Sequence, residues 1–306
     1  MTGLRFDRLA TLYVADLWRQ SVTAAPDRIP ILMYHSISDD DGSGTHPYFC
    51  TTTTPAMFAQ QMAHLHEQHY RTITPAEAAV RCAGNAHDSG KCVVITFDDG
   101  FFDFYGRAAP VLARYRFGAT VYLPTAHIGD TRRSFKNREC LTWSEVDELC
   151  RSGFSFGSHT VSHPQLTELD RAGVADEVGR SKDTIEQRLG RAIDSFAYPF
   201  AFPAADAAFK RALREILDQA GYGNGVCTTI GRAGGRQHDA FFMKRLPINS
   251  GDDTRLFEAK LAGSYDWLAG PQSWFKRMKL KRAKRWAPSQ ASRLSSADSK
   301  AGHTYG

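Results

Sequence analysis

The sequence predicts an α/β protein built as a (β/α) barrel, and two features of the chain support this prediction. Longer amphipathic segments with helical periodicity separate short apolar runs, so successive strands should pair in parallel through right-handed crossovers. About seven such runs favour a barrel. The runs have strand length, and several are rich in Val, Ile and aromatic residues; they cover 29–34, 92–97, 119–123, 154–156, 195–198, 225–228 and 242–248.

Length and composition indicate one large core with extensions at both ends. The chain has 306 residues, whereas α/β barrels commonly take about 200 to 250 residues as one domain. With 42% hydrophobic and 23% charged residues, it belongs neither to the disordered nor to the bilayer-embedded class. We therefore expect a helical extension over 1–28, a barrel over 29–250, a C-terminal helix over 251–270 and a basic tail without assigned fold over 271–306.

The basic character of the chain is concentrated in this tail. The net charge is +5, but seven basic residues lie between Lys276 and Arg285, and the rest of the chain holds 31 basic against 33 acidic residues. Two tryptophans flank this cluster in the segment 274–286, which favours peripheral contact with an anionic membrane surface. A merely solvated tail is the alternative, and we disfavour nucleic acid as a partner.

Cysteine usage and the N-terminus bear on the compartment. The six cysteines form no CxxC pair and no metal-ligand spacing, which indicates reduced, structural thiols. Residues 1–21 lack an uninterrupted apolar region and a cleavage site, and no apolar run approaches the roughly 18 residues of a membrane span. We expect a cytoplasmic protein, peripheral at the inner membrane face if the tail binds lipid.

Several helices have recognisable ends. Thr142 and Glu145 have the spacing of a capping box, which predicts a helix through about Cys150. Further helices are predicted over 166–189, stopped by Gly190, and over 204–220 and 256–268.

Polar clusters directly follow four of the predicted strands. His35, Asp98 with Asp99, His159 and Pro199 each come immediately after an apolar run. Because the carboxyl ends of parallel barrel strands share one face, we expect these clusters to lie on one rim.

Two of these clusters contain metal-ligating residue types. In Asp98-Asp99-Gly100, adjacent carboxylates point in divergent directions, so one can bind a metal while the other faces substrate; an acidic turn is the alternative. His159 and His163 are four residues apart, so they can converge on one ion from one face of a helical turn. Together with Asp99 they predict a catalytic divalent-metal site with open positions, with zinc as the first choice and cobalt, manganese or nickel as alternatives.

The order of these motifs resembles the polysaccharide deacetylase family, also called the NodB-homology or carbohydrate esterase 4 family. Thr96 to Gly100 matches its first motif and His159 to His163 matches its second, and the resemblance covers residues 29–250. It implies a distorted barrel, often seven-stranded, that removes N-acetyl groups from an amino-sugar glycan or glycolipid. It also implies that Asp99 and the two histidines hold a divalent metal and that Asp98 is the general base.

The third motif of the family is only partly matched. In the segment from Ser195 to Phe200, Pro199 and Phe200 fit the pattern, but the arginine that normally orients the base is missing. Arg245 is one candidate to replace it. The resemblance implies that the Phe200 amide helps to hold the oxyanion, with Tyr198 and Pro199 beside it.

The late Leu-x-His triplet, which normally gives the general acid, is absent between residues 200 and 250. However, Ile31 to Ile37 resembles the first strand of a permuted subgroup that includes poly-N-acetylglucosamine deacetylases, where the acid histidine comes first. His35 is therefore the proposed acid. A histidine that merely caps a strand end is the alternative.

Two other functions stay open from the sequence. One is hydrolysis of a cyclic amide or imide by the same barrel, and the other is a non-catalytic glycan-binding barrel with a decayed site. Other polar or aromatic residues are predicted to be structural: Asp39 to Asp41 as a solvated loop, Trp143 as a core residue, and His64, His66 and His69 as surface residues.

Overall fold

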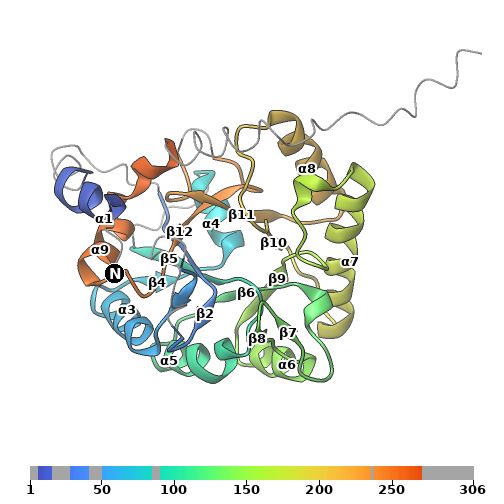
Figure 1. Ribbon diagram of the computed structural model, residues 1–306, viewed down its shortest axis with the longest axis horizontal. Helices are drawn as coiled ribbons and strands as arrows, with labels where there is room; N and C mark the ends of the chain where they lie inside the picture. The colour runs from blue at the N-terminus through green and yellow to red at the C-terminus, as the bar shows by residue number, and fades with distance from the viewer. Residues whose placement is uncertain (1–5, 16–27, 41–49, 85–89, 236–237, 271–306) are drawn as a thin grey trace, which may run out of the picture.

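The computed structural model of the chain describes residues 6–15, 28–40, 50–84, 90–235 and 238–270 (Figure 1). The basic segment 274–286, for which we predicted membrane contact, lies outside these residues.

Seven parallel strands form a closed barrel, as predicted. Each strand pairs with the next one along the chain, and the first strand pairs with both the second and the last, which closes the ring. The strands are β1 (Ile31–Tyr34), β5 (Cys92–Phe97), β6 (Thr120–Leu123), β9 (Ser155–Ser158), β10 (Ser195–Ala197), β11 (Asn224–Ile230) and β12 (Met243–Pro247). A two-residue strand, β4 (Arg71–Thr72), adds to the N-terminal end of β5.

Helices surround this ring of strands (Figure 1). They cover the outer faces of the strands and bury one continuous apolar layer there, which includes Leu32, Val93, Val121 and Leu213. The outer helices are α3 (Pro55–Glu67), α5 (Ala109–Arg114), α6 (Trp143–Arg151), α7 (Arg171–Leu189), α8 (Ala207–Gln219) and α9 (Thr254–Ala262).

A second, smaller core fills the inside of the barrel. Inward-facing side chains such as Val94, Tyr122 and Val226 pack together there with Ala78 and Ala79 of α4 (Pro75–Cys82). In Figure 1, α4 lies inside the ring of the other helices. Because Ala78 and Ala79 share this cluster with residues from the starts of the strands, we infer that α4 closes the N-terminal end of the barrel.

The predicted helix ends are partly confirmed. The side chain of Thr142 accepts from the Glu145 amide while the Glu145 carboxylate accepts from the Thr142 amide, so α6 has the expected capping box. Helix α7 stops at Gly190, which has a φ of 64°, but the predicted segment begins as a separate 3₁₀ turn, Leu166–Glu168.

The predicted single helix over 256–268 is wrong. Helix α9 ends at Ala262 because Gly263 adopts a left-handed conformation, with a φ of 95°, and its amide closes the last turn. The chain then continues as a short 3₁₀ turn, Asp266–Leu268. A glycine within an apolar periodic segment was the signal of this break.

The two ends of the described chain lie side by side (Figure 1). Helix α1 (Phe6–Ala10) runs into a π-helical turn, Thr11–Ala15, and Asp7 accepts a hydrogen bond of 2.7 Å from the Tyr265 hydroxyl. Trp267 donates to Thr11 at 3.1 Å. None of the described helices combines the length and the apolar composition that crossing a bilayer requires.

The minor structural predictions have mixed outcomes. Trp143 is buried, as expected, and His66 and His69 are exposed. His64 was predicted to lie on the surface, but its ring packs edge-on against Phe257 with centroids 6.1 Å apart, because α9 covers this part of α3. All six cysteines lie in the described part of the chain, and none of them forms a disulfide there.

Candidate metal centre and active site

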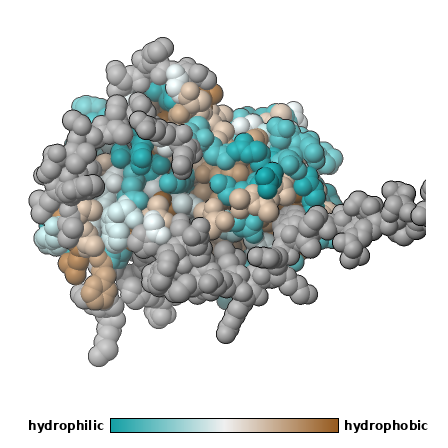
Figure 2. Space-filling view, turned by 90° about the horizontal axis from the view of Figure 1, so that it is seen from above, coloured by the Kyte–Doolittle hydropathy of each residue, from teal (hydrophilic) through white to brown (hydrophobic). Residues whose placement is uncertain are grey.

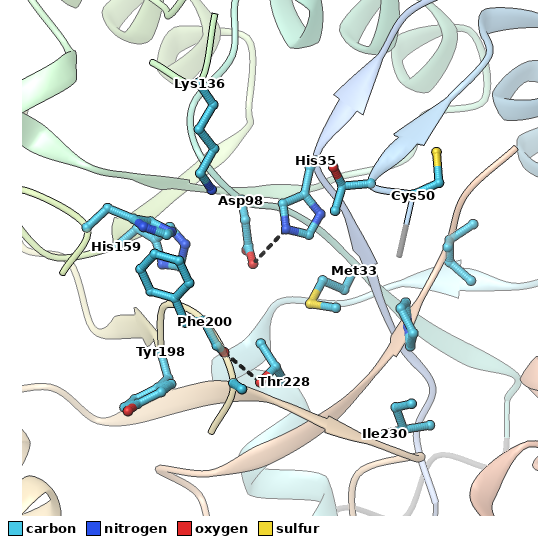
Figure 3. A pocket seen from close by; sticks show the side chains of 15 residues that line it. Met33, His35, Cys50, Asp98, Lys136, His159, Tyr198, Phe200, Thr228 and Ile230 are labelled. Atoms are coloured by element: carbon cyan, nitrogen blue, oxygen red, sulfur yellow. Dashed lines mark hydrogen bonds and ion pairs between the residues drawn. The ribbon is translucent and has the colours of Figure 1, made fainter. Parts of the chain in front are cut away.

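The polar clusters that follow the strands meet at the C-terminal end of the barrel, around one pocket of about 460 Å³ (Figure 3). His35 follows β1, Asp98 follows β5, and His159 follows β9, and all three line this pocket. The stretch after β10 contributes Tyr198 and Phe200. Pro199 lies between these two residues in the chain but is not among the residues that line the pocket.

Three buried side chains beside this pocket form a possible metal site. The Asp99 Oδ1 atom lies 3.3 Å from Nε2 of His163 and 3.7 Å from Nε2 of His159, and one ligand atom from each of the three residues lies within 4.8 Å of the others. Asp99 Oδ1 is buried and has no hydrogen-bond partner. A buried, unpaired carboxylate oxygen is costly, and a divalent cation held by these three groups would satisfy it.

The electrostatics of Asp99 favour a ligand carboxylate. Burial alone would raise its pKa, but His163, His35 and Lys136 together lower the pKa well below the ordinary value. Asp99 is therefore ionised throughout the neutral range, which is the form that binds a cation.

A hydrogen bond sets the tautomer of His159. Its Nδ1 atom lies 2.8 Å from the Ala197 carbonyl oxygen, which can only accept, so Nδ1 carries the proton and Nε2 is left with a free lone pair. Burial lowers the pKa of His159 to about 4, against the attraction of Asp98. The neutral imidazole is the form that binds a metal, and a second hydrogen bond of this kind orients such ligands.

The turn that carries the two histidines is not helical, so the expected helical turn is wrong. Thr160 and His163 have φ values of 69° and 57°, and the His163 amide donates to the Thr160 hydroxyl at 3.0 Å. The two imidazole rings still converge, with centroids 4.7 Å apart. Asp99 also has a positive φ, 71°, so two of the three candidate ligands hold a conformation that side chains rarely adopt.

Asp98 forms a buried, bidentate ion pair with Arg245 of β12. The two terminal guanidinium nitrogens each lie 2.7 Å from one carboxylate oxygen. The side chain of Arg245 is 0% exposed and that of Asp98 is 2% exposed. Arg245 also donates to the Thr96 hydroxyl and the Cys227 carbonyl oxygen, both at 3.2 Å. Burial would raise the pKa of Asp98, but Arg245 lowers it to about 2. Arg245, which we named from the sequence as one candidate to replace the missing arginine, therefore lies beside Asp98.

His35 faces the same carboxylate from the neighbouring strand β1. Its Nε2 atom lies 3.9 Å from Asp98 Oδ2, and its side chain is 19% exposed. Burial lowers the pKa of His35, while the charges of Asp98 and Asp99 oppose this shift. In Figure 3, the ring points from β1 into the pocket toward Asp98.

Comparisons with known proteins agree with this geometry. A model of the polysaccharide deacetylase family matches residues 85–224. The polysaccharide deacetylase homologue YxkH of Bacillus subtilis (strain 168) is 30% identical over 237 residues, which cover 78% of this chain and 77% of YxkH. The chain belongs to this family. It is thus a polysaccharide deacetylase, a metal-dependent hydrolase of N-acetyl groups.

Two further relatives of this deacetylase are informative. The structure of Streptococcus pyogenes deacetylase PplD in complex with acetate has a TM-score of 0.66 and 26% identity, and the match covers 77% of this chain and 99% of PplD. The poly-beta-1,6-N-acetyl-D-glucosamine N-deacetylase of Escherichia coli (strain K12) is 30% identical over 139 residues, 42% of this chain and 20% of that protein.

Phe200 of the deacetylase lies at the mouth of the pocket in a strained conformation. Its φ is 56°, its side chain is among the exposed apolar ones, at 48%, and its ring packs against His163 with centroids 4.6 Å apart. The Thr228 hydroxyl donates to the Phe200 carbonyl oxygen at 2.7 Å. This bond anchors the loop after β10 to β11.

Sequence reasoning missed Lys136, which also lines the pocket. It lies at the tip of a hairpin formed by β7 (Ser134–Phe135) and β8 (Arg138–Glu139), and its Nζ atom lies 2.9 Å from Asp99 Oδ2. A lysine in a polar loop carries no motif. The only local signal was Asn137, a residue that tolerates the positive φ of a hairpin turn.

Of the aspartates predicted to form a solvated loop, Asp39 and Asp40 lie in the described part of the chain, and neither lines the pocket. Asp39 and Asp40 are largely exposed and pair with Arg107 and Arg138. His238 also lies outside the residues that line the pocket.

Proposed function

We propose that this deacetylase removes N-acetyl groups from an amino-sugar glycan or glycolipid, with zinc as its metal. One observation carries the proposal: Asp98, paired with Arg245, faces the same pocket as His35 and the buried cluster of Asp99, His159 and His163. A candidate base, a candidate acid and a possible cation site thus surround one pocket.

Asp99, His159 and His163 would hold the cation through one oxygen and two imidazole nitrogens, a donor set typical of catalytic zinc. When bound, the cation would polarise the acetyl carbonyl and lower the pKa of water. Asp98 would accept the proton of that water, because its low pKa keeps it ionised at neutral pH.

His35 would act as the general acid. Amide hydrolysis requires that the departing amine be protonated before the C–N bond breaks. His35 lies close enough to Asp98, at 3.9 Å, for both groups to contact one bound acetamide. The ordinary pKa of histidine lies near neutral pH, and the charges of Asp98 and Asp99 oppose the lowering of the His35 pKa by burial, which helps His35 to carry a proton for this step.

Phe200 would stabilise the charge that develops on the acetyl oxygen through its backbone amide. The positive φ of Phe200 and the anchoring of its carbonyl by Thr228 support a fixed orientation of this peptide. Tyr198 and Pro199 would fix the conformation of the loop after β10. Tyr198 packs edge-on against Phe202, with ring centroids 4.9 Å apart.

The relatives support the proposed substrate class. A poly-N-acetylglucosamine deacetylase is among the proteins that resemble this chain, and the order of His35 before the other motifs fits the permuted subgroup. We therefore place the enzyme in exopolysaccharide or cell-envelope glycan biosynthesis.

The direct test measures acetate release by the full-length chain. The metal is first removed with a chelator, and Zn²⁺, Co²⁺, Mn²⁺ or Ni²⁺ is then added with N-acetylglucosamine oligomers or lipid-linked acetylated sugars. We expect activity only with added metal, and a loss of about 100- to 10,000-fold in Asp98→Asn, the usual contribution of a general base. An Asp98→Asn variant as active as wild type would refute the assignment.

The same experiment separates the alternatives that the sequence left open. A ring-opened acid as the only product, from cyclic amides or imides, would point to the second enzymatic function. Stoichiometric metal binding without turnover of any of these substrates would point to a glycan-binding barrel.

We further propose that the protein is cytoplasmic and contacts the inner membrane face through residues 274–286. The described part of the chain exposes apolar side chains near both of its ends: Phe6, Leu9, Tyr13 and Trp267 are 73%, 39%, 54% and 40% exposed. Figure 2 shows hydrophobic side chains at the left edge of the molecule, the side on which α1 lies in Figure 1. Exposed aromatic and apolar residues next to a basic stretch suit an anionic lipid surface.

A further inference from the structure

The two oxygens of the Asp99 carboxylate have different surroundings. Oδ1 faces the Nε2 atoms of His159 and His163, at 3.7 and 3.3 Å, and has no hydrogen-bond partner. Oδ2 accepts a hydrogen bond of 2.9 Å from the Lys136 ammonium. A cation bound at Oδ1 and the lysine at Oδ2 would use separate atoms of one carboxylate, so they do not compete for the same oxygen.

We propose that Lys136 is a positioning residue of the metal site. By holding Oδ2, it fixes the rotation of the Asp99 carboxylate so that Oδ1 is presented to the cation as a single ligand atom. Ligating carboxylates in metal sites are commonly hydrogen-bonded in this way, and the outer partner tunes the affinity. This inference rests on the metal site given under Proposed function.

The hairpin that carries Lys136 is anchored on both sides of its tip. Phe135 stacks on His127 with ring centroids 4.1 Å apart. Arg138 donates to the hydroxyls of Ser36 at 2.9 Å and Thr52 at 3.2 Å. Two successive positive φ values, 50° and 61° at Lys136 and Asn137, form the tight turn between the strands. The backbone of Lys136 is therefore held over the site before any cation binds.

Aromatic rings guide the lysine side chain toward Asp99. The ammonium lies 4.7 Å from the centroid of Phe135 and 5.8 Å from that of Phe200. Figure 3 shows the side chain of Lys136 extending into the pocket. Lys136 is 44% exposed, but its partner Asp99 is only 2% exposed, so this ion pair is screened less than one at the surface.

The positioning role of Lys136 and an alternative role predict opposite changes in metal affinity when the lysine is removed. If the ammonium instead occupied the place of the cation, removing it would strengthen metal binding. If it positions Asp99, removing it frees the carboxylate to rotate and weakens binding.

The experiment titrates Co²⁺ into chelator-treated, full-length protein and follows the visible absorption of the bound ion. We expect Lys136→Met to raise the dissociation constant about 10- to 100-fold, the usual cost of losing an outer partner of a metal ligand. We also expect the Co²⁺ spectrum to change, because a rotated carboxylate alters the coordination geometry. Lys136→Arg keeps a cationic donor and should restore both affinity and spectrum.

Two further variants serve as controls. Lys136→Asn suits the positive φ of the turn and should weaken metal binding as Lys136→Met does, even if the latter folds poorly. Lys91→Met removes a lysine at the opposite end of β5, where it lies over Tyr70, and should leave Co²⁺ affinity unchanged. An affinity of Lys136→Met or Lys136→Asn equal to or tighter than that of wild type would overturn the inference.

These measurements use no substrate, so they separate this inference from the proposed function. Unchanged Co²⁺ binding in the variants would refute the positioning role and leave the deacetylase proposal intact. Weakened Co²⁺ binding in the variants, together with no acetate release by wild type from any acetylated sugar, would support the positioning role and refute the deacetylase proposal. A wild-type chain that binds no divalent cation would overturn both.

Discussion

If Asp98 is the general base, as proposed, its pairing with Arg245 determines how strong that base is. A pKa of about 2 keeps the carboxylate ionised but makes it a weak proton acceptor, since a base works best with a pKa near the working pH. Asp98 should therefore hold a proton only briefly. The neighbouring His35, 3.9 Å away, is well placed to receive it and pass it to the leaving amine.

Removing Arg245 should shift the pH dependence of activity. Asp98 must be ionised to act, so activity falls as the pH decreases through its pKa. Burial raises this pKa and Arg245 lowers it, so in Arg245→Met the acidic limb of kcat/KM should move to higher pH. A pH profile from about 4 to 8 measures the shift. With a pKa of about 2, Asp98 should give no acidic limb in this range in wild type, whereas the limb of Arg245→Met should enter it, since the ordinary pKa of aspartate is about 3.9.

Arg245→Lys is the control for this experiment because it retains one cation beside Asp98. It should show a smaller shift of the acidic limb than Arg245→Met. Thermal melting must accompany the kinetics, because an unpaired buried charge costs about 3–5 kcal/mol of stability. Identical pH profiles of wild type and a folded Arg245→Met between about pH 4 and 8 would show that Arg245 does not set the pKa of Asp98.

Replacing His35 should separate amide from ester hydrolysis. If His35 protonates the leaving amine, His35→Gln should lower kcat on an N-acetylated sugar by about 100- to 10,000-fold. An aryl acetate needs little protonation of its phenolate leaving group, so its hydrolysis should be much less affected. Parallel assays of acetate release from both substrates provide the measurement, and equal losses on both would argue against a role as acid.

Sequence motifs identified four of the site residues because these residues lie in contiguous stretches. Asp98 with Asp99, and His159 with His163, each belong to a short pattern that follows one strand. Arg245 and Lys136 carry no such pattern. Arg245 reaches Asp98 only because β12 and β5 flank the same strand β1. Lys136 reaches Asp99 only because a hairpin brings it to the C-terminal end of the barrel.

At the level of elements, the seven strands were predictable because buried parallel strands are continuous apolar runs. Segments whose backbone conformation depends on a positive φ could not be predicted from such runs. The turn at His163 and the break of α9 at Gly263 both depend on positive φ values of single residues, which periodicity does not reveal.

The close packing around Gly157 of β9 leaves no room for a larger side chain. A Cβ atom there would lie 2.6 Å from the Tyr122 ring and 2.7 Å from the Ser195 carbonyl oxygen. Gly157→Ala should therefore lower the free energy of unfolding by about 1–3 kcal/mol, the usual cost of overpacking, as measured by urea denaturation.

Gly179→Ala is the matched control, because a Cβ atom at this position of α7 meets nothing within 4 Å. It should be neutral or slightly stabilising, since alanine favours a helix over glycine. The interpretation of Gly157 fails if both variants unfold at the same urea concentration as wild type.

At the level of the whole molecule, the basic tail should determine membrane association. Full-length protein should co-sediment with vesicles that contain anionic lipid, and a form ending at Gly270 should do so much less, because about 1 kcal/mol per basic residue is lost near such a surface. Neutral vesicles are the control. Equal sedimentation of both forms would exclude the tail as the membrane contact.

Closure of the ring also has a consequence for biosynthesis of the enzyme. Asp98 and Arg245 are 147 residues apart in the chain, and their ion pair forms only when the last strand joins the first. A ribosome must therefore release nearly the entire barrel before Asp98 acquires its partner. Catalytic competence should appear late and abruptly during synthesis, so that incomplete chains carry the metal-binding motifs but remain inert toward cellular sugars.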